Sequence, residues 1–166
     1  MPGQLAGQSR FKYWIPAILA AILISIFSAR GFGETHTARY ILPALHWLFP
    51  AASPRLLHRL HTGIRKMAHI AEFGVFSILI FRARRSGRQG WRLEWAIATL
   101  LIAVGYASLD EIHQIFVPGR GPSVRDVAID TVGALLAQLL AWWYETRKWL
   151  LAERPQDESG CSRPSL

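Results

Sequence analysis

The chain has 166 residues, of which 51% are hydrophobic and 18% are charged, and 19 Lys and Arg stand against 11 Asp and Glu. A soluble two-domain enzyme is excluded, because the length suits one domain and the charged share lies below the roughly 25% of ordinary soluble domains. Mean hydropathy is positive at +0.20. In a soluble protein the net charge of +8 would indicate nucleic acid, but here the basic residues flank long apolar runs, so we expect a membrane and no nucleic-acid partner. The lone cysteine, Cys161, excludes an intramolecular disulfide.

Four apolar segments have the composition of bilayer spans, for which about 20 helical residues are needed, with tolerance for tilt and snorkelling ends. Backbone hydrogen bonds must close internally in lipid, so each segment is expected to be a helix. The sequence therefore predicts an all-α integral membrane bundle of four transmembrane helices, at about residues 13–29, 67–81, 91–109 and 127–144. These form one membrane domain, residues 13–144, between a cytoplasmic N-terminus at 1–12 and a polar cytoplasmic tail at 145–166 that is expected to be disordered at its end.

The first span has no ionisable residue until Arg30, and a basic start precedes it. It could be mistaken for a cleavable signal peptide, but its apolar run is longer than usual and the only nearby small-residue pattern, residues 29–31, is a poor cleavage site. A plain first span or signal anchor is therefore favoured.

The connection between spans one and two carries two unusual segments. Residues 40–50 are apolar and interrupted by proline, which indicates an interfacial or re-entrant segment. Residues 54–67 place leucines and Ile64 toward one side and arginines, including Arg65, largely away from it. We expect this amphipathic helix to lie at the membrane surface or to lead into span two.

Basic residues set the predicted orientation. The short connection between spans two and three carries five arginines, and positive charge in short loops marks the cytoplasmic side. Both termini should then be cytoplasmic in a multi-pass membrane protein. The arginines are Arg82, Arg84, Arg85, Arg88 and Arg92. Tryptophans near the span ends are interpreted as interface anchors: Trp14, Trp91, Trp95, Trp142 and Trp143.

Ionisable groups are costly inside a membrane, yet here they gather at three predicted helix ends that alternating topology places on one face. That face is extracytoplasmic by the charge argument. The residues are Lys66, His69 and Glu72 at span two; Asp110, Glu111, His113, Gln114 and Arg120 at and after the end of span three; and Asp126 and Asp130 at span four. The sequence therefore predicts a shared charged pocket.

Helical spacing refines this pocket. Lys66, His69 and Glu72 follow steps of three and share a drifting stripe. Asp110, His113 and Gln114 share a side if their helix extends through Ile115. Asp126 and Asp130 are four apart, and Gly133 continues their stripe, where a glycine lets another helix approach closely. Ser123 is positioned to cap the fourth helix, with Asp126 three residues later in a capping box.

The pattern Lys66-x-x-His69-x-x-Glu72-Phe73, then Asp110-Glu111-x-His113-Gln114 running on to Pro118-Gly119-Arg120, then Asp126-x-x-x-Asp130-x-x-Gly133, resembles the VanZ-like family. The resemblance is strong over residues 65–133. The first span and the loop after it fit the family only in their order and position along the chain. It implies a small multi-spanning bacterial membrane protein, from a family named after a member linked to teicoplanin resistance. One position departs from the family, which usually has asparagine where this chain has Asp130.

Two functions fit this pocket. The first is an enzyme, a hydrolase or transferase at the outer membrane surface, with His69 or Glu72 as the base, Asp110 and Glu111 as further acid–base groups, and Lys66 or Arg120 stabilising an anion. No cofactor is expected; a metal held by His69, Glu72, Asp110 and His113 is a weak alternative, because no recognised metal motif is present.

The second function is binding without turnover of an envelope lipid, a lipid-linked glycan or a lipoglycopeptide antibiotic, with His113, Gln114, Asp126 and Asp130 also lining the site. A transporter is less favoured because four spans leave little room for alternating access. The alternative to all of these is a structural or partner-binding membrane protein whose buried charges lock helix packing.

Overall fold

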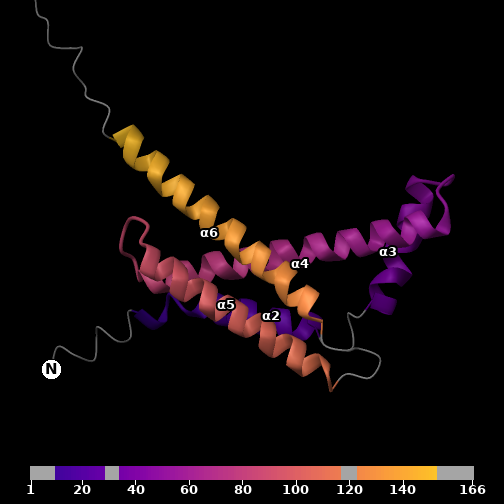
Figure 1. Cartoon of the computed structure of the whole chain (residues 1–166), viewed down its shortest axis with the longest axis horizontal. Helices are drawn as coiled ribbons and strands as arrows, with labels where there is room; N and C mark the ends of the chain where they lie inside the picture. Colours follow the sequence, from indigo (N-terminus) through magenta and orange to yellow (C-terminus); the bar gives the residue numbers. More distant parts are fainter. Residues whose placement is uncertain (1–9, 29–33, 117–122, 153–166) are drawn as a thin grey trace, which may run out of the picture.

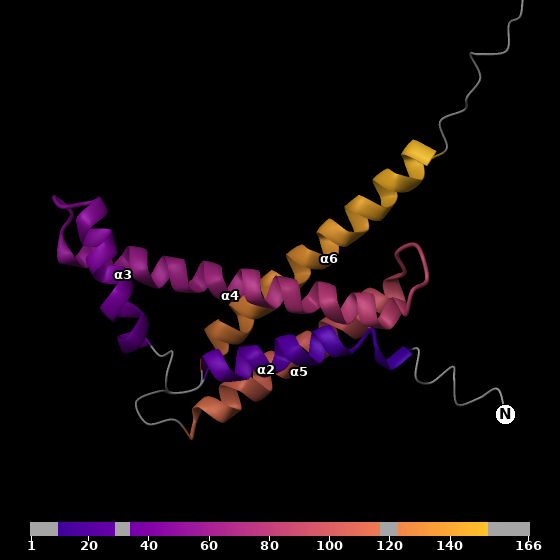
Figure 2. The same ribbon diagram turned by 180° about the vertical axis from the view of Figure 1, so that it is seen from behind.

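The computed structural model describes residues 10–28, 34–116 and 123–152, and within these ranges the chain forms helices and no strands. Figure 1 shows α4 and α6 crossing, α2 and α5 lying side by side, and α3 packed at the N-terminal end of α4, and Figure 2 shows the same arrangement from behind. The C-terminal part of α6 projects beyond the other helices. In chain order the helices are α2 (Ile15–Ser28), α3 (Glu34–Leu48), α4 (Pro54–Arg85), α5 (Leu93–Gln114) and α6 (Val124–Ala152).

The predicted all-α class is confirmed, whereas the number of membrane spans is only partly supported. Among the described residues, α5 and α6 are long and apolar enough to cross a membrane. Helix α2 is apolar but has only 14 residues. Residues 67–81 lie inside the 32-residue α4, whose two ends are rich in basic residues. Length and composition therefore identify two candidate spans in the structure, and the four-span arrangement stays a prediction.

The segment between predicted spans one and two consists of α3, which contains Pro43, and the first half of α4. Ser53 caps α4 by accepting a hydrogen bond from the backbone N–H of Leu56 (3.3 Å), and Pro54 occupies a position at the helix start where no amide donor is needed. The helix then runs without a break to Ser86, whose left-handed φ of 49° ends it. The amphipathic stretch therefore leads directly into the predicted second span.

The closest helix contact in the bundle is the crossing of α4 and α6. A Cβ atom added to Gly133 would lie 2.9 Å from Ile70 Cα, and still closer to the Ile70 carbonyl oxygen, so only glycine fits. Gly74 faces the Gly133 carbonyl oxygen from the other helix. One turn further on, Ser77 donates a hydrogen bond to the Ala134 carbonyl oxygen (3.2 Å) and accepts one from Gln138 Nε2 (2.8 Å). Small residues and a polar link are typical of helix contacts in membranes, and the predicted close approach at Gly133 is confirmed.

Trp95 does not behave as the interface anchor that the sequence suggested. Its side chain is only 4% exposed and packs against Phe81 of α4, with ring centroids 6.4 Å apart. The guanidinium groups of Arg88 and Arg92 lie 4.5 and 5.3 Å from the Trp95 ring centroid. Because cations stack favourably on indole, the arginine-rich connection covers this ring instead of leaving it at a surface.

Replacing Gly133 with alanine should lower stability by about 1–3 kcal/mol, because the added methyl group forces α4 and α6 apart. Gly105→Ala in α5 is the matched control, since no atom lies within 4 Å of its added Cβ. The measurement is the thermal unfolding midpoint of each purified variant in detergent. Equal midpoints for the two variants would contradict the assigned crossing point.

Candidate functional site

A first pocket lies where the C-terminal ends of α2 and α5 approach the middle of α4, and its volume is about 200 Å³. Ile24 and Phe27 of α2 supply an apolar wall, and the remaining lining is mostly polar. It includes the following side chains: Ser28, Thr37, Arg65, His69, Glu72 and Asp110. The pocket therefore combines apolar surface with both signs of charge.

A second pocket, of about 170 Å³, lies between α4 and α6 and shares Arg65 and His69 with the first. Its other polar lining residues are Thr62, Lys66, Asp126 and Asp130. Residues from predicted spans two, three and four thus meet around two adjoining cavities. Arg120 lies outside the residues that the structure describes.

His69 of α4 and Asp130 of α6 are in contact with each other between the two pockets. His69 Nδ1 lies 3.3 Å from Asp130 Oδ1, at the outer limit of hydrogen-bond distance, and the two atoms are not aligned as a hydrogen bond. The Asp130 side chain is 4% exposed whereas that of His69 is 36% exposed. The buried carboxylate therefore lies beside the imidazole, and the His69 ring lines both pockets.

The helix crossing explains why these two side chains meet. His69 directly precedes Ile70, and Asp130 lies one turn before Gly133, so the backbone contact of Gly133 with Ile70 brings both residues to the same level. His69 and Asp130 therefore meet because Gly133 has no Cβ atom to hold the two helices apart.

Asp110 is bonded into a buried network between α2 and α5. Its Oδ2 atom accepts hydrogen bonds from Ser28 Oγ (2.7 Å) and Gln114 Nε2 (3.0 Å), and Gln114 Nε2 also donates to Ser28 Oγ (2.9 Å). Asp110 and Gln114 are 8% and 7% exposed. Buried polar groups with several partners rigidify a packing arrangement, so this network holds the two helix ends together.

Glu111 stabilises the start of α6 from the neighbouring helix. Its Oε2 atom accepts the backbone N–H of Ser123 at 2.6 Å, while Ser123 Oγ accepts the N–H of Asp126 at 3.3 Å. The predicted Ser123 cap is therefore confirmed, but Glu111 supplies the reciprocal bond that Asp126 would give in a complete capping box. This arrangement leaves the Asp126 side chain to line the second pocket.

His113 does not share the side of Asp110 and Gln114. Helix α5 ends at Gln114 and does not extend through Ile115, and His113 is exposed. His113 and Gln114 are neighbours on the helix and point about 100° apart. Packing of α5 against α2 buries Gln114 and leaves His113 exposed. In the parts of the chain that the structure describes, no three His, Cys, Asp or Glu side chains come together to hold a metal ion.

One residue of the site, Arg65, was not recognised in the sequence. Arg65 was expected to point largely away from the apolar side, but it is half-buried and lines both pockets. Arg65, His69 and Glu72 follow the i, i+4, i+7 spacing of one helix face, which was the available signal. Outside the pockets, His61 is 1% exposed and its Nε2 atom lies 3.3 Å from Thr37 Oγ1 of α3.

Asp110 and Glu72 should respond differently to truncation. Asp110→Ala removes the acceptor shared by two buried donors, and stability should fall by about 1–3 kcal/mol. Glu72→Ala should change it little, because Glu72 is half-buried at the pocket wall. Thermal unfolding midpoints and accumulation in the membrane fraction measure the difference, and a larger loss for Glu72→Ala would overturn this division.

Comparison with known proteins agrees with the motifs at this site. The sequence model of the VanZ/LLP1 family matches residues 11–145, which include all the residues that line the two pockets. No curated protein and no solved structure matches the chain. A match over most of the chain is sufficient to assign the family, and the chain belongs to the VanZ-like family.

Proposed function

We propose that the chain is a multi-pass protein of the bacterial inner membrane in which α2, the second part of α4, α5 and α6 all span the bilayer. The outward faces of α2, α5 and α6 support this, because they carry large apolar side chains that water would solvate poorly. Examples 49–69% exposed are Leu19, Ile22, Leu101, Leu136 and Leu140. The short α2 is extended by the interfacial residues that precede it, since bilayers adapt to short spans.

The distribution of charge supports cytoplasmic termini. The last turn of α4 and the short connection to α5 together carry the five arginines, which the positive-inside rule assigns to the cytoplasm. With an even number of spans, both termini lie on that side, and the two polar pockets open on the extracytoplasmic side.

An alkaline phosphatase reporter, active only outside the cytoplasm, tests this orientation. Fused after Leu166 it should be inactive, whereas fused within the connection between α5 and α6 it should be active. Expression of both fusions is checked by immunoblot. An active reporter at Leu166 would reverse the proposed orientation.

For the pockets, the function that the geometry supports best is binding of an envelope lipid or lipid-linked glycan by its headgroup. The single observation that carries this is the pair of pockets sharing Arg65 and His69, with cations, carboxylates and an apolar wall together. Lys66 and Arg65 suit a phosphate or carboxylate, Glu72 and Asp126 suit hydroxyl or amine donors, and Ile24 with Phe27 suits an acyl chain. A lipoglycopeptide of the teicoplanin type has the same three kinds of group.

A second candidate is catalysis on the same lipid, as a hydrolase or transferase. The observation that favours it is that His69 Nδ1 lies 3.3 Å from the buried carboxylate of Asp130, with Glu72 on the wall of the first pocket. An imidazole and nearby carboxylates are the components of general acid–base chemistry. VanZ-like proteins usually have asparagine at the position of Asp130, so this pair is not a shared feature of the family, and binding is the first proposal.

Mass spectrometry of envelope lipids and glycans, with and without the protein, is the test of the binding proposal. A species should copurify with the wild-type protein, and Glu72→Gln should lower its retention about tenfold, equivalent to about 1.4 kcal/mol. Glu94→Gln is the matched control, because it removes the same charge from an exposed residue paired with Arg92 outside the pockets. Equal retention in both variants would contradict the proposed site.

Asp130→Asn separates binding from catalysis, because it keeps the side-chain shape but removes the charge beside His69. For an enzyme, cells carrying this variant should retain the bound lipid but lose the change in envelope composition that the wild-type protein causes. For a binding protein, both readouts should stay at the wild-type level.

A further inference from the structure

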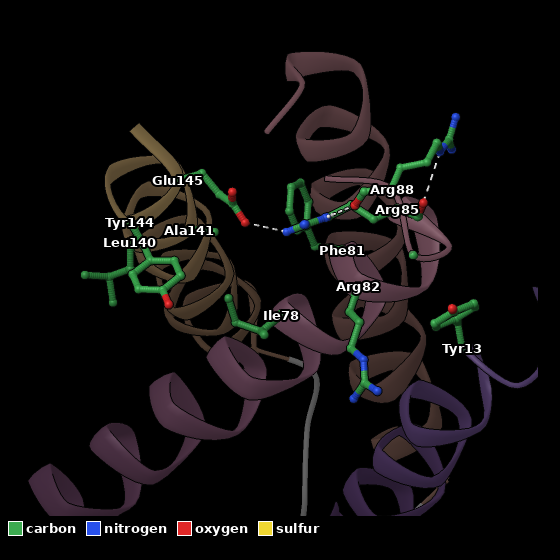
Figure 3. A pocket seen from close by; sticks show the side chains of 11 residues that line it. Tyr13, Ile78, Phe81, Arg82, Arg85, Arg88, Leu140, Ala141, Tyr144 and Glu145 are labelled. Carbon is green, nitrogen blue, oxygen red and sulfur yellow. Dashed lines mark hydrogen bonds and ion pairs between the residues drawn. The ribbon is translucent and has the colours of Figure 1, made fainter. Parts of the chain in front are cut away.

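A third pocket lies at the other end of the bundle and takes no part in the proposed function. Its volume is about 510 Å³, and it lies between the last turns of α4 and the second half of α6, with Tyr13 on one side. Figure 3 shows its side chains, which include three arginines of the connection that the sequence marked as cytoplasmic.

Two of the three arginines are already engaged. Arg85 Nη1 donates to Glu145 Oε1 at 2.6 Å, and its Nε atom donates to the Arg88 carbonyl oxygen at 2.8 Å. Arg88 donates to the carbonyl oxygens of Arg84 and Arg85, both at 3.0 Å, and stacks over Trp95. Each of these guanidinium groups therefore commits two of its five donors within the protein, and the charge of Arg85 is paired with Glu145.

Arg82 differs from both of its neighbours. Its guanidinium group makes no hydrogen bond or ion pair with the part of the chain that the structure describes, and no dashed line reaches it in Figure 3. A guanidinium group presents five donors in a planar fork that matches phosphate oxygens. The pocket thus holds one arginine with its donors available.

The remaining walls suit a hydrocarbon chain. Ile78 and Phe81 of α4 and Leu140 and Ala141 of α6 contribute apolar side chains to the lining. The Tyr13 side chain is held against the α4–α5 connection because Gly87, with a φ of 82°, leaves space for it. A Cβ atom at Gly87 would lie 2.8 Å from Tyr13 Oη.

We propose that this pocket binds an anionic phospholipid, with its phosphate on Arg82 and an acyl chain along Ile78 and Leu140. Basic pockets between membrane helices on the cytoplasmic side are suited to anionic lipid headgroups. The site lies at the end of the bundle opposite Glu72 and His69, so it is independent of whatever the polar pockets bind.

Lipid binding to the full chain in a neutral detergent tests the proposal. Phosphatidylglycerol and phosphatidylcholine with identical acyl chains are titrated separately, and bound lipid is counted by native mass spectrometry. We expect phosphatidylglycerol to bind more tightly, and Arg82→Gln to weaken it about tenfold. Arg84→Gln is the matched control, because Arg84 carries the same charge on the same helix but does not line the pocket.

Two further binding measurements test which chemical groups of the lipid the pocket recognises. Glu145→Gln removes the carboxylate that occupies Arg85, so phosphatidylglycerol should bind more tightly than to the wild-type chain. Inorganic phosphate alone should compete weakly, because it lacks the acyl chain. The proposal is overturned if Arg82→Gln and Arg84→Gln weaken binding equally, if the two lipids bind alike, or if inorganic phosphate competes as well as the lipid. Circular dichroism of each variant confirms that the helices are retained.

Discussion

The contact of the Gly133 backbone with that of Ile70 is the constraint on which the rest of this structure depends. It brings α4 and α6 closer than any side chain at position 133 would allow. Polar side chains next to the crossing then reach across it: Asp130 meets His69 on one side, and Gln138 meets Ser77 on the other. In a bundle with little hydrophobic driving force between helices in lipid, close backbone packing and interhelical polar contacts are the main sources of association.

The polar residues at one end of the bundle divide into two groups with different consequences. The first group, Asp110, Gln114 and Glu111, is buried. Hydrogen bonds of Asp110 and Gln114 join α2 to α5, and the hydrogen bond of Glu111 joins α5 to the start of α6. Asp110 also lines the first pocket together with Glu72, and Lys66 lines the second. The hydrogen bonds of the first group are those that a structural role requires, whereas Glu72 and Lys66 contribute surface to the cavities.

The two ends of the bundle carry different kinds of charge. The pockets near His69 combine acidic and basic groups, which suits a ligand with donors as well as an anion. The pocket near Arg82 is mainly cationic above an apolar wall, since Glu145 neutralises only one of its three arginines. The two ends of the bundle therefore suit ligands of different charge, which is the basis of the two binding proposals.

The sequence by itself determined the helical class, the family, the Ser123 cap and the close approach at Gly133. Each depends on a local property: an apolar run, a motif, a capping side chain or an absent Cβ atom. Only the tertiary structure decided that Arg65 faces the pockets, that His113 does not, and that Trp95 is buried. Neighbouring residues on a helix point about 100° apart, so their roles depend on the rotation of each helix about its axis. That rotation is set by packing against other helices, through residues distant in the chain.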